Sequence, residues 1–444
     1  MSRITALILS VLCTAVSVQG QNPIVQTRFT ADPAPMVWGD TVFLYTSHDE
    51  NDAEGFHMKD WLLYTSTDMA NWTDHGTVAS LSDFPWAADD GAWAPQVVER
   101  GGRYFMYCPV AQRGAWMAIG VLTADSPYGP FSDPIGKPLI VNSIEDIDPT
   151  VFIDDDGQAY LYWGNPHLYY VRLGEDMISY EGDIVRCDTI PSDYQEGPWL
   201  YKHDGRYYLA YASTCCPEGI GYAVSDEVGS VWHRAGTVMD HNPKSSGNHP
   251  GIIHFRGNNY LFGFGYQLHQ MESDVHCERR SVCCAQFEYG ADGSIPELVF
   301  WDEQHVEQLS PLDPFRRVEA ETIAWADGVT TARGDSVGMY VTAIHNTDYI
   351  RVRGVDFGQG AASFTASVAS ISREGDIELR LDSLGGTRIG GVHVGSTGGR
   401  SHWCQRTCPV EGATGVHDLF LVFTGEGKWP LFDFDWWQFA PTSP

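Results

Sequence analysis

The stretch DPTVFIDDDGQAYLYWG, residues 148–164, contains the pattern that decides the fold. A proline after its first residue is followed by an apolar strand, a tight turn and an aromatic strand. This pattern occurs five times, with its prolines at Pro33, Pro95, Pro149, Pro198 and Pro250. Each copy continues into a second, weaker hairpin, so each unit of about 50 residues supplies roughly four strands. The repeat predicts a five-bladed β-propeller; a β-helix or a stacked sandwich is the alternative, but its usual repeat is shorter.

The composition agrees with many short strands. The chain of 444 residues contains 46 Gly and 24 Pro, which excludes coiled coils and long helical bundles. Its apolar fraction of 43% and aromatic fraction of 13% suffice for a large core. With 58 Asp+Glu against 27 Lys+Arg, the net charge is −31, which argues against a nucleic-acid partner and an anionic membrane surface. We expect an all-β protein whose ligand is neutral or cationic.

The N-terminus has the pattern of a secretory signal peptide over residues 1–20. Arg3 supplies the positive n-region, and Ile4–Val18 form an apolar h-region that is too short for a comfortable membrane span. Small residues suit a cleavage site just before Gln21, where the mature chain is expected to begin. The sequence therefore predicts a secreted, extracellular protein that does not insert into the membrane.

The cysteines predict at least one unpaired thiol. Of the 10 cysteines, Cys13 lies in the signal segment, which leaves nine. Secretion favours disulfides, and Cys404 with Cys408 is the most local candidate, although the sequence leaves the connectivity open. Two further pairs are adjacent in sequence: Cys215-Cys216 and Cys283-Cys284. Adjacent cysteines are a poor geometry for tetrahedral ligation, so no zinc site is predicted.

Acidic residues recur at one position of the repeat. Equivalent positions in a propeller lie at equal depth around the axis, and the start of each innermost strand points towards that axis. The five units present there Asp32, Trp93-Ala94, Asp148, Glu196-Gly197 and Asn248-His249. Three carboxylates therefore approach one small space, where like charges raise at least one pKa. Because structures rarely bear that cost without use, the acids are interpreted as catalytic rather than as turn formers.

Paired carboxylates beside an aromatic ring suggest glycoside hydrolysis. One acid must stay protonated to donate to the leaving oxygen, and a second must be ionised to activate water or attack carbon. Carboxylates on opposite blades are far enough apart to admit a water molecule. This separation favours inversion at the anomeric carbon.

At these residues the chain resembles glycoside hydrolase family 43. The similar segments are TADPAPMV around Asp32, GAWAPQ around Trp93, DIDPTVF around Asp148, YQEGPW around Glu196 and SGNHPGI around His249. The resemblance covers roughly residues 22–305 and implies a catalytic propeller domain over residues 21–305. It also implies an inverting hydrolase that acts on arabinose- and xylose-containing polysaccharides.

The resemblance implies a role for each acid. Asp32 is expected to be the general base that deprotonates the attacking water, and Glu196 the general acid that protonates the leaving group. Asp148 is expected to orient Glu196 and to tune its pKa, which agrees with coupling between like charges.

Four further residues are predicted to bind substrate: Trp93, Trp163, His249 and Arg280. His249 matches an axial histidine that is linked to a water or a calcium ion in the family, with a structural histidine as the alternative. Trp93 and Trp163 are expected to wall the sugar subsite, with core packing as the alternative. Arg280 resembles a substrate-contacting arginine of the last blade, although the neighbouring Arg279 is an open choice.

The C-terminal part forms a separate unit. Residues 306–317 carry no blade pattern and are predicted to be a linker, and alternating apolar residues over 318–444 predict a β-sandwich. This unit resembles carbohydrate-binding module family 6, which implies a jelly-roll sandwich and a structural calcium ion. Glu319, Glu321 and Asp435 match the positions that hold the ion, and hard oxygen ligands suit calcium.

The same resemblance implies a change in sugar binding by this unit. Where the family has two aromatic platforms and an asparagine, this sequence has Val352, Arg400 and Asp433. Loss of both stacking rings weakens binding at that cleft. We therefore expect a structural module or a different binding face.

Together these observations predict a secreted, exo-acting hydrolase that releases L-arabinofuranose, D-xylose or both from arabinoxylan-type hemicellulose of plant cell walls. No organic cofactor is expected, and a calcium ion near the propeller axis is an open alternative. Within the enzyme class, an endo-α-1,5-L-arabinanase is the alternative, because the loops set the shape of the groove. A catalytically silent sugar-binding propeller is the alternative of another class, and retention of all three acids argues against it.

Overall fold

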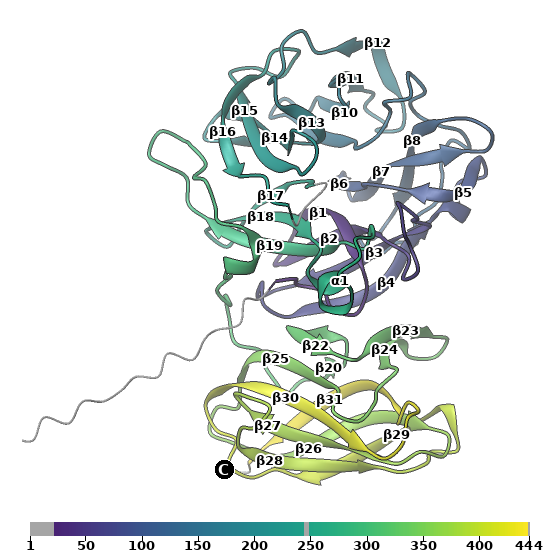
Figure 1. Cartoon of the computed structure of the whole chain (residues 1–444), viewed down its shortest axis with the longest axis vertical. Coiled ribbons are helices and arrows are strands. Elements are labelled where there is room, and N and C mark those ends of the chain that lie inside the picture. The colour runs from purple at the N-terminus through teal and green to yellow at the C-terminus, as the bar shows by residue number, and fades with distance from the viewer. Residues whose placement is uncertain (1–21, 244–247, 443–444) are drawn as a thin grey trace, which may run out of the picture.

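The computed structural model describes residues 22–243 and 248–442 of the chain. Strands dominate it, and the described residues contain one α-helix, α1 (Gln267–Glu272). The prediction of an all-β protein is confirmed. Figure 1 places residues up to about 300 in an upper body and the C-terminal residues in a second, layered body below it. The predicted signal peptide lies outside the described residues, and none of the described helices is long and apolar enough to cross a membrane.

The upper body contains five antiparallel sheets. The first sheet consists of β1 (Thr30–Trp38), β2 (Thr41–His48), β3 (Asp60–Ser66) and β4 (Trp72–Ser80). The second consists of β5 (Ala87–Ala92), β6 (Gln96–Arg100), β7 (Arg103–Gln112) and β8 (Met117–Ala124). The third consists of β9 (Thr150–Ile153), β10 (Ala159–Trp163), β11 (Tyr169–Leu173) and β12 (Tyr180–Arg186). The fourth consists of β13 (Tyr194–His203), β14 (Arg206–Ser213), β15 (Gly219–Ser225) and β16 (His233–Met239), and the fifth of β17 (Gly251–Phe255), β18 (Asn258–Gly265) and β19 (Ser281–Phe287).

The five sheets form a closed ring through one strand each. Strand β1 contacts β6, β6 contacts β9, β9 contacts β13, β13 contacts β17, and β17 contacts β1 again. A narrow cavity lies where these strands begin, and its lining includes the five repeat prolines Pro33, Pro95, Pro149, Pro198 and Pro250. Each repeat therefore supplies one sheet, and its proline marks the end of that sheet nearest the axis.

The fifth sheet has three strands instead of the expected four, because the start of the described chain lies beside its last strand. The backbone N–H of Ile24 donates to the carbonyl of Val282 at 2.9 Å, and that of Thr30 donates to the carbonyl of Arg280 at 2.9 Å. The residues just before β1 thus run along β19. These hydrogen bonds close the ring by joining its first and last sheets.

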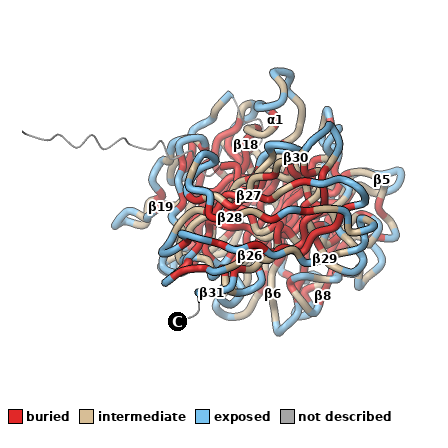
Figure 2. Tube along the Cα trace, turned by 90° about the horizontal axis from the view of Figure 1, so that it is seen from below, coloured by how far each residue is buried: buried red, intermediate tan, exposed pale blue. Residues whose placement is uncertain are grey.

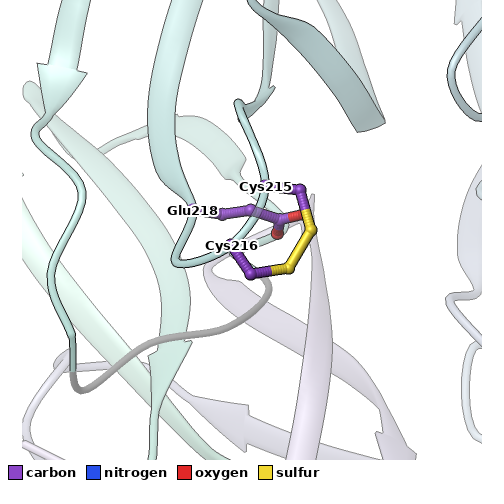
Figure 3. Close-up of side chains that lie close together, drawn as sticks. All are labelled: Cys215, Cys216 and Glu218. Carbon is purple, nitrogen blue, oxygen red and sulfur yellow. A yellow bond between two sulfur atoms is a disulfide. The ribbon is translucent and has the colours of Figure 1, made fainter.

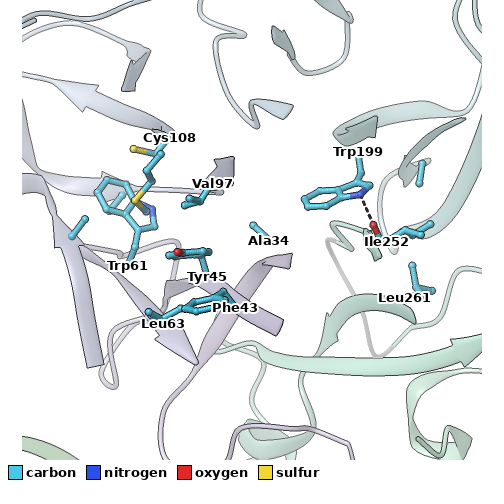
Figure 4. Close-up of a cluster of buried hydrophobic side chains, with 14 of the residues drawn as sticks. Ala34, Phe43, Tyr45, Trp61, Leu63, Val97, Cys108, Trp199, Ile252 and Leu261 are labelled. Carbon is cyan, nitrogen blue, oxygen red and sulfur yellow. Dashed lines mark hydrogen bonds between the residues drawn. The ribbon is translucent and has the colours of Figure 1, made fainter. Parts of the chain in front are cut away.

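Apolar side chains from adjacent sheets fill the space between them. Figure 4 shows this core, which includes Tyr45, Trp61 and Trp199. The indole N–H of Trp199 on β13 donates to the carbonyl of Ile252 on β17 at 3.0 Å, so a core ring also ties two sheets together. Full burial of one large apolar side chain contributes about 1.5–3 kcal/mol to the stability of the fold. Many such aromatic side chains together stabilise the contacts between the five sheets.

The lower body is a β-sandwich, as predicted. One sheet has the order β23-β24-β31-β26-β29 with β20 beside β31, and the other has the order β22-β25-β30-β27-β28. The first contains β20 (Val318–Glu319), β23 (Thr330–Gly334), β24 (Gly338–Thr342), β26 (Ala361–Ser370), β29 (Gly399–Pro409) and β31 (Asp433–Pro441). The second contains β22 (Trp325–Asp327), β25 (Tyr349–Asp356), β27 (Gly375–Leu381), β28 (Arg388–Val394) and β30 (Val416–Gly425). Figure 2, seen from below, shows buried strand segments bordered by exposed loops.

The two bodies share a sheet, which the sequence did not predict. Strand β21 (Thr322–Ile323) follows the first strand of the sandwich but pairs with β4 of the first sheet of the ring. Thr322 lies opposite Thr73, and their hydroxyl oxygens are 2.8 Å apart. The C-terminal unit therefore extends the sheet of the N-terminal one.

The predicted linker, residues 306–317, is packed rather than free. Val306 is buried, and the backbone N–H of Leu309 donates to the carbonyl of Asp68 at 2.9 Å. Leu312 then forms a parallel bridge with Val355 of the sandwich. The segment therefore contacts the upper body through Leu309 and the sandwich through Leu312.

The predicted pairing of Cys404 with Cys408 is wrong. Both side chains are free thiols on β29, where they face Val368 and Phe364 of the neighbouring strand. Four residues along a strand span about 13 Å, which is too far for a disulfide. Among the described residues the disulfide joins Cys215 and Cys216 instead.

Candidate active site

The three acids and His249 meet at the axis of the ring. Asp32 lies in β1, Asp148 precedes β9, Glu196 lies in β13, and His249 precedes β17. Asp32, Asp148 and His249 line the axial cavity, together with Gly197, the neighbour of Glu196. Asp32 and Asp148 are each 4% exposed. The positions that the repeat alignment assigns to one depth therefore lie around one small space.

The backbone at these positions aims the side chains inwards. The residue before the proline has a positive φ at Asp32 (50°), Asp148 (57°) and Gly197 (57°). This left-handed conformation is uncommon for a residue with a Cβ. In the fourth sheet it falls on a glycine, where a Cβ would lie 2.9 Å from the His249 ring. Glycine therefore makes room for His249, and the acid of this sheet comes one residue earlier, at Glu196.

His249 lies between the acids. Its Nδ1 is 3.4 Å from Oδ1 of Asp32, whereas its Nε2 is 3.4 Å from Oε1 of Glu196 and 3.8 Å from Oδ2 of Asp148. Burial lowers the pKa of His249, but the three carboxylates outweigh burial and raise that pKa to about 10. The imidazolium form therefore dominates at neutral pH and offsets part of the negative charge.

The same side chains are the candidates for an axial calcium ion. Asp148, Glu196 and His249 each offer a ligand atom, and these atoms lie within 4.8 Å of one another. Three ligand atoms at this spacing can hold a metal ion, so the axial calcium ion stays a prediction.

Asp32 is held by donors on its side of the site. Nη1 of Arg280 donates to Oδ1 of Asp32 at 2.9 Å, and the hydroxyl of Ser47 donates to Oδ2 at 2.7 Å. Arg280 is 4% exposed and its guanidinium also binds Asp49, with Nε–Oδ2 and Nη2–Oδ1 distances of 3.0 and 2.8 Å. Of the two adjacent arginines, Arg280 thus contacts Asp32, whereas Nε of Arg279 donates to the carbonyl of Ala53.

Glu196 is held by an amide. The side-chain N–H of Asn165, in the loop after β10, donates to Oε2 of Glu196, and Gln195 donates to the side-chain carbonyl of Asn165 at 3.0 Å. Asp148 accepts the backbone N–H of Gly197 at 3.1 Å, next to Glu196. Asp32 and Glu196 therefore have separate sets of partners on opposite sides of the imidazole.

Of the three predicted acids, Asp148 is the one whose pKa the site clearly alters. Burial raises its pKa, Glu196 and Asp32 raise it further, and His249 and the Gly197 amide oppose them, which leaves the pKa at about 7. The sequence-based expectation that crowding raises at least one pKa agrees with this result, although burial is the larger cause.

A fourth acid, Glu218, was missed at the sequence level. It is 2% exposed, and its Oε2 accepts the backbone N–H of Asn248 at 2.9 Å. Burial, together with the charge of Glu196, raises its pKa to about 9 against the opposing effect of His249. Glu218 comes from the loop after β14, which has no fixed place in the repeat, so the repeat alignment could not find it. Asp49, from the loop after β2, was missed for the same reason.

The two tryptophans differ. Trp163 is fully buried, donates its indole N–H to Asp146 at 2.9 Å and stacks on Tyr169, so its prediction as a subsite wall is wrong. The residue lies inside the third sheet, where core packing excludes substrate. Trp93 is only partly buried and meets the exposed ring of Phe56 edge-on, with a centroid distance of 6.3 Å.

Family models match both parts of the chain. Residues 20–295 match "Glycosyl hydrolases family 43". The chain belongs to glycosyl hydrolase family 43. Residues 319–441 match "Carbohydrate binding module (family 6)". The protein is therefore a glycoside hydrolase with a module of the second family, as the resemblances implied.

Relatives in family 43 cover nearly the whole chain. An arabinoxylan arabinofuranohydrolase from Paenibacillus polymyxa is 35% identical over 95% of this chain and 74% of its own length. One from Bacillus subtilis (strain 168) is 34% identical over 94% of this chain and 92% of its own length.

Solved structures of family 43 are also similar. The crystal structure of an arabinoxylan arabinofuranohydrolase from Bacillus subtilis in complex with cellotetraose has a TM-score of 0.84 and 34% identity, and covers 96% of this chain and 98% of its own. A β-xylosidase/α-arabinofuranosidase from a compost microbial metagenome, in complex with xylotriose in a calcium-free form, has a TM-score of 0.56 and 26% identity over 63% of this chain and 97% of its own. The first of these matches spans both bodies of the molecule.

The family 6 module holds the predicted calcium ligands near the shared sheet. Oε2 of Glu321 and Oδ1 of Asp435 are buried and have no hydrogen-bond partner within the protein. Burial raises the pKa of Glu321 to about 9. Glu319 is more exposed and accepts Nη2 of Arg317 at 2.8 Å, and the same nitrogen is 3.6 Å from Asp435. Two buried carboxylate oxygens without donors suit a hard cation. Among the described residues, Glu319, Glu321 and Asp435 do not form a group with all three ligand atoms within 4.8 Å of one another.

The positions expected at the usual sugar cleft of that module hold a buried aliphatic side chain and an ion pair. Val352 is fully buried, and Arg400 places Nη1 3.5 Å from Oδ1 of Asp433, which is itself 1% exposed. The pair provides no flat apolar ring for a sugar to stack on.

Proposed function

We propose that the protein is a secreted, inverting α-L-arabinofuranosidase that removes terminal arabinofuranose from arabinoxylan-type hemicellulose. The support comes from relatives at 34–35% identity that are named arabinoxylan arabinofuranohydrolases and span nearly the whole chain. One solved structure of such an enzyme has a TM-score of 0.84. β-D-Xylosidase activity is tested alongside, because another structural neighbour is a β-xylosidase/α-arabinofuranosidase.

In this proposal Asp32 is the general base and Glu196 the general acid. The observation that carries the assignment is that the two acids contact different nitrogens of one imidazole, each at 3.4 Å. The ring holds them apart, which leaves room for a water between the base and the sugar. Arg280 positions the proposed base, because its Nη1 donates to Oδ1 of Asp32 at 2.9 Å. Asp148 acts on Glu196 through the Gly197 amide and His249.

The proposal is tested with 4-nitrophenyl α-L-arabinofuranoside, 4-nitrophenyl β-D-xyloside, arabinoxylan and debranched arabinan. Release of arabinose from arabinoxylan, with little action on debranched arabinan, is the expected result. Cleavage of debranched arabinan into oligomers indicates the endo-arabinanase, and binding without turnover of any substrate indicates a silent propeller. Proton NMR of the first-formed product tests inversion, because retained anomeric configuration contradicts the assigned roles.

We further propose that the ring of five sheets is a five-bladed β-propeller and that the sandwich is a jelly roll. The cyclic contacts of the five inner strands and the family 43 relatives support the first assignment. The match to a family 6 module supports the second.

We also propose that the protein binds a structural calcium ion and that it is secreted. Glu321 and Asp435 are proposed to hold a structural calcium ion with Glu319, supported by their buried, unpartnered oxygens. Secretion is supported by the signal-like N-terminal sequence and by the Cys215–Cys216 disulfide, since disulfides persist in oxidising compartments. Mass spectrometry of the mature N-terminus tests the second point, with cleavage near Gln21 expected.

A further inference from the structure

The loop that carries the disulfide lies at the active-site end of the fourth sheet. Strand β14 pairs with β13 so that Ser213 lies opposite Tyr194, two residues before Glu196. The next residue, Thr214, donates its backbone N–H to the carbonyl of Asp193 at 2.8 Å. Cys215 and Cys216 follow directly, so the register places them beyond the end of β13 that bears the proposed general acid.

The other end of the loop is tied to the strand of His249. Oε2 of Glu218 accepts the backbone N–H of Asn248 at 2.9 Å, and Asn248 also accepts the backbone N–H of Phe264 at 3.3 Å. Residues 214–218 therefore connect β13, which holds Glu196, with the residues before β17, which include His249. Nε2 of His249 and Oε1 of Glu196 are 3.4 Å apart, so both ends of the loop lie near the acid.

The disulfide forms the exposed surface of this loop, whereas Glu218 lies beneath it. Both cysteines are exposed and Glu218 is 2% exposed. One side-chain atom of each of these three residues lies within 4.8 Å of the others, and Figure 3 shows the carboxylate turned towards the sulfur atoms. The exposed sulfur and Cβ atoms of this disulfide carry no hydrogen-bond donor.

That surface is chemically unlike its surroundings. The other groups near Glu196 are polar: the amides of Asn165 and Gln195 and the buried carboxyl of Glu218. A sugar ring presents C–H groups on its faces, and these groups pack on apolar, polarisable atoms as they do on aromatic rings. The general acid protonates the leaving group, which is the xylan chain. A surface beside Glu196 therefore faces that chain and not the arabinose.

We propose that the Cys215–Cys216 disulfide is a specificity-determining platform that packs on the xylose residue next to the scissile bond. The proposal rests on the assignment of Glu196 as the general acid. It implies that the disulfide contributes to binding of the xylan backbone and not to binding of the arabinose that is removed.

The test measures binding by calorimetry in an Asp32→Asn background, which removes the base and hence turnover. The probes are xylotriose, for the backbone side, and L-arabinose, for the other side. The added double substitution Cys215→Ala/Cys216→Ala is expected to weaken xylotriose binding about 5- to 10-fold and to change arabinose binding less than twofold. The matched control is Cys404→Ala in the same background, because it removes a partly exposed thiol of the sandwich.

A second measurement keeps the sequence intact. Reduction of the Asp32→Asn protein with tris(2-carboxyethyl)phosphine is expected to weaken xylotriose binding, and reoxidation is expected to restore it. Equal weakening of xylotriose and L-arabinose binding indicates a structural role and overturns the proposal. Unchanged xylotriose affinity after reduction or in the double variant also overturns it, as does a lack of xylotriose binding by the Asp32→Asn protein. The experiment involves no hydrolysis, so its failure is distinct from that of the proposed function, which fails if the wild-type enzyme releases no arabinose from arabinoxylan.

Discussion

Asp32 and Glu196 have separate partners, so single substitutions can distinguish their roles. Asp32→Ala removes the group that activates water and is expected to lower kcat on every substrate by about 10²–10⁴-fold. Glu196→Ala is expected to lower kcat on arabinoxylan by a similar factor but to spare 4-nitrophenyl α-L-arabinofuranoside, because a good leaving group needs little protonation. Initial rates on both substrates test this difference, and equal losses in both variants on both substrates contradict the assignment.

Asp49 is a positioning residue for the base. It is fully buried and accepts two side-chain hydrogen bonds from Arg280 at 2.8 and 3.0 Å. Its Oδ2 also accepts the backbone N–H of Arg280 at 2.8 Å. Asp49→Asn leaves the buried guanidinium with Asp32 as its remaining carboxylate, so the charge of Arg280 binds Asp32 more tightly and makes it a weaker base. We expect kcat to fall at least tenfold with little change in KM, and stability to fall by about 3–5 kcal/mol.

The control for Asp49 is Arg279→Lys. Arg279 donates to the Ala53 carbonyl and is partly exposed, so its substitution tests the effect of altering a neighbouring arginine away from the acids. Steady-state kinetics and chemical denaturation of both variants separate activity from stability. A rise in KM with unchanged kcat for Asp49→Asn contradicts a role that acts through the base.

Glu218 predicts a pH dependence of stability. Its pKa is about 9 in the folded protein, against 4.5 for an unperturbed glutamate. Between these values the unfolded chain loses a proton that the folded protein keeps, so the folded state loses about 1.4 kcal/mol per pH unit. Glu218→Gln mimics the protonated form and keeps an acceptor for the Asn248 N–H. It is expected to raise Tm at pH 8 and to flatten the fall of Tm between pH 5 and 9.

Glu227→Gln is the matched control, since it makes the same substitution at an exposed residue in the loop after β15. Differential scanning calorimetry at several pH values tests the comparison. Parallel pH profiles for wild type and Glu218→Gln contradict the raised pKa of Glu218.

At the scale of elements, the repeat predicted the strands better than the loops. Each repeat proline lies in or just before the innermost strand of a sheet, because the spacing of apolar strands and turns is set locally by the sequence. The acids could be found from register alone, since equivalent strand positions lie at equal depth. Glu218, Asp49 and Asn165 come from loops whose paths depend on contacts far away in sequence, so no local pattern identifies them. Trp163 lies on a strand, but the sequence could not tell which sheet face is covered.

The join between the bodies is a second feature that sequence could not give. Strand β21 is only two residues long, and nothing in two residues specifies a partner in another domain. Asn71 strengthens this join: its Oδ1 accepts the backbone N–H of Arg353 at 2.8 Å, and its Nδ2 donates to the Arg353 carbonyl at 3.0 Å. Both bonds cross from the first sheet to the sandwich.

Asn71→Ala tests how much this join contributes. The substitution removes both hydrogen bonds to the backbone of Arg353, whose carbonyl still accepts Nε2 of Gln308 at 3.1 Å, and is expected to cost about 1–2 kcal/mol. The packed segment 306–317 should also become easier to cut, because it bridges the same two bodies. Thermal unfolding and limited proteolysis measure both effects, with the exposed Asn142→Ala as control. Unchanged stability and cleavage rate in Asn71→Ala contradict a supporting role for this contact.

At the scale of the whole molecule, the shared sheet makes the two bodies one mechanical unit. The carbonyl of Glu321 accepts the backbone N–H of Asp74 at 3.2 Å, and Asp74 also accepts the hydroxyl of Thr331 at 2.6 Å. The proposed calcium ligand Glu321 is thus bonded to the first sheet of the catalytic ring. An ion held there would stabilise the catalytic ring as well as the sandwich.

Removal of calcium is therefore expected to lower the stability of the whole protein. A ligand that binds only the folded state at about 100 times its Kd contributes about 2.7 kcal/mol, so a chelator should lower Tm by several degrees. Because Glu321 is bonded to the first sheet, unfolding should remain a single transition in calorimetry and not split into two. Glu321→Gln removes one negative ligand without removing volume, and its Tm should no longer respond to the chelator. A wild-type Tm that is unaffected by chelation contradicts the site, and a chelator shift that persists in Glu321→Gln places the ion elsewhere in the molecule.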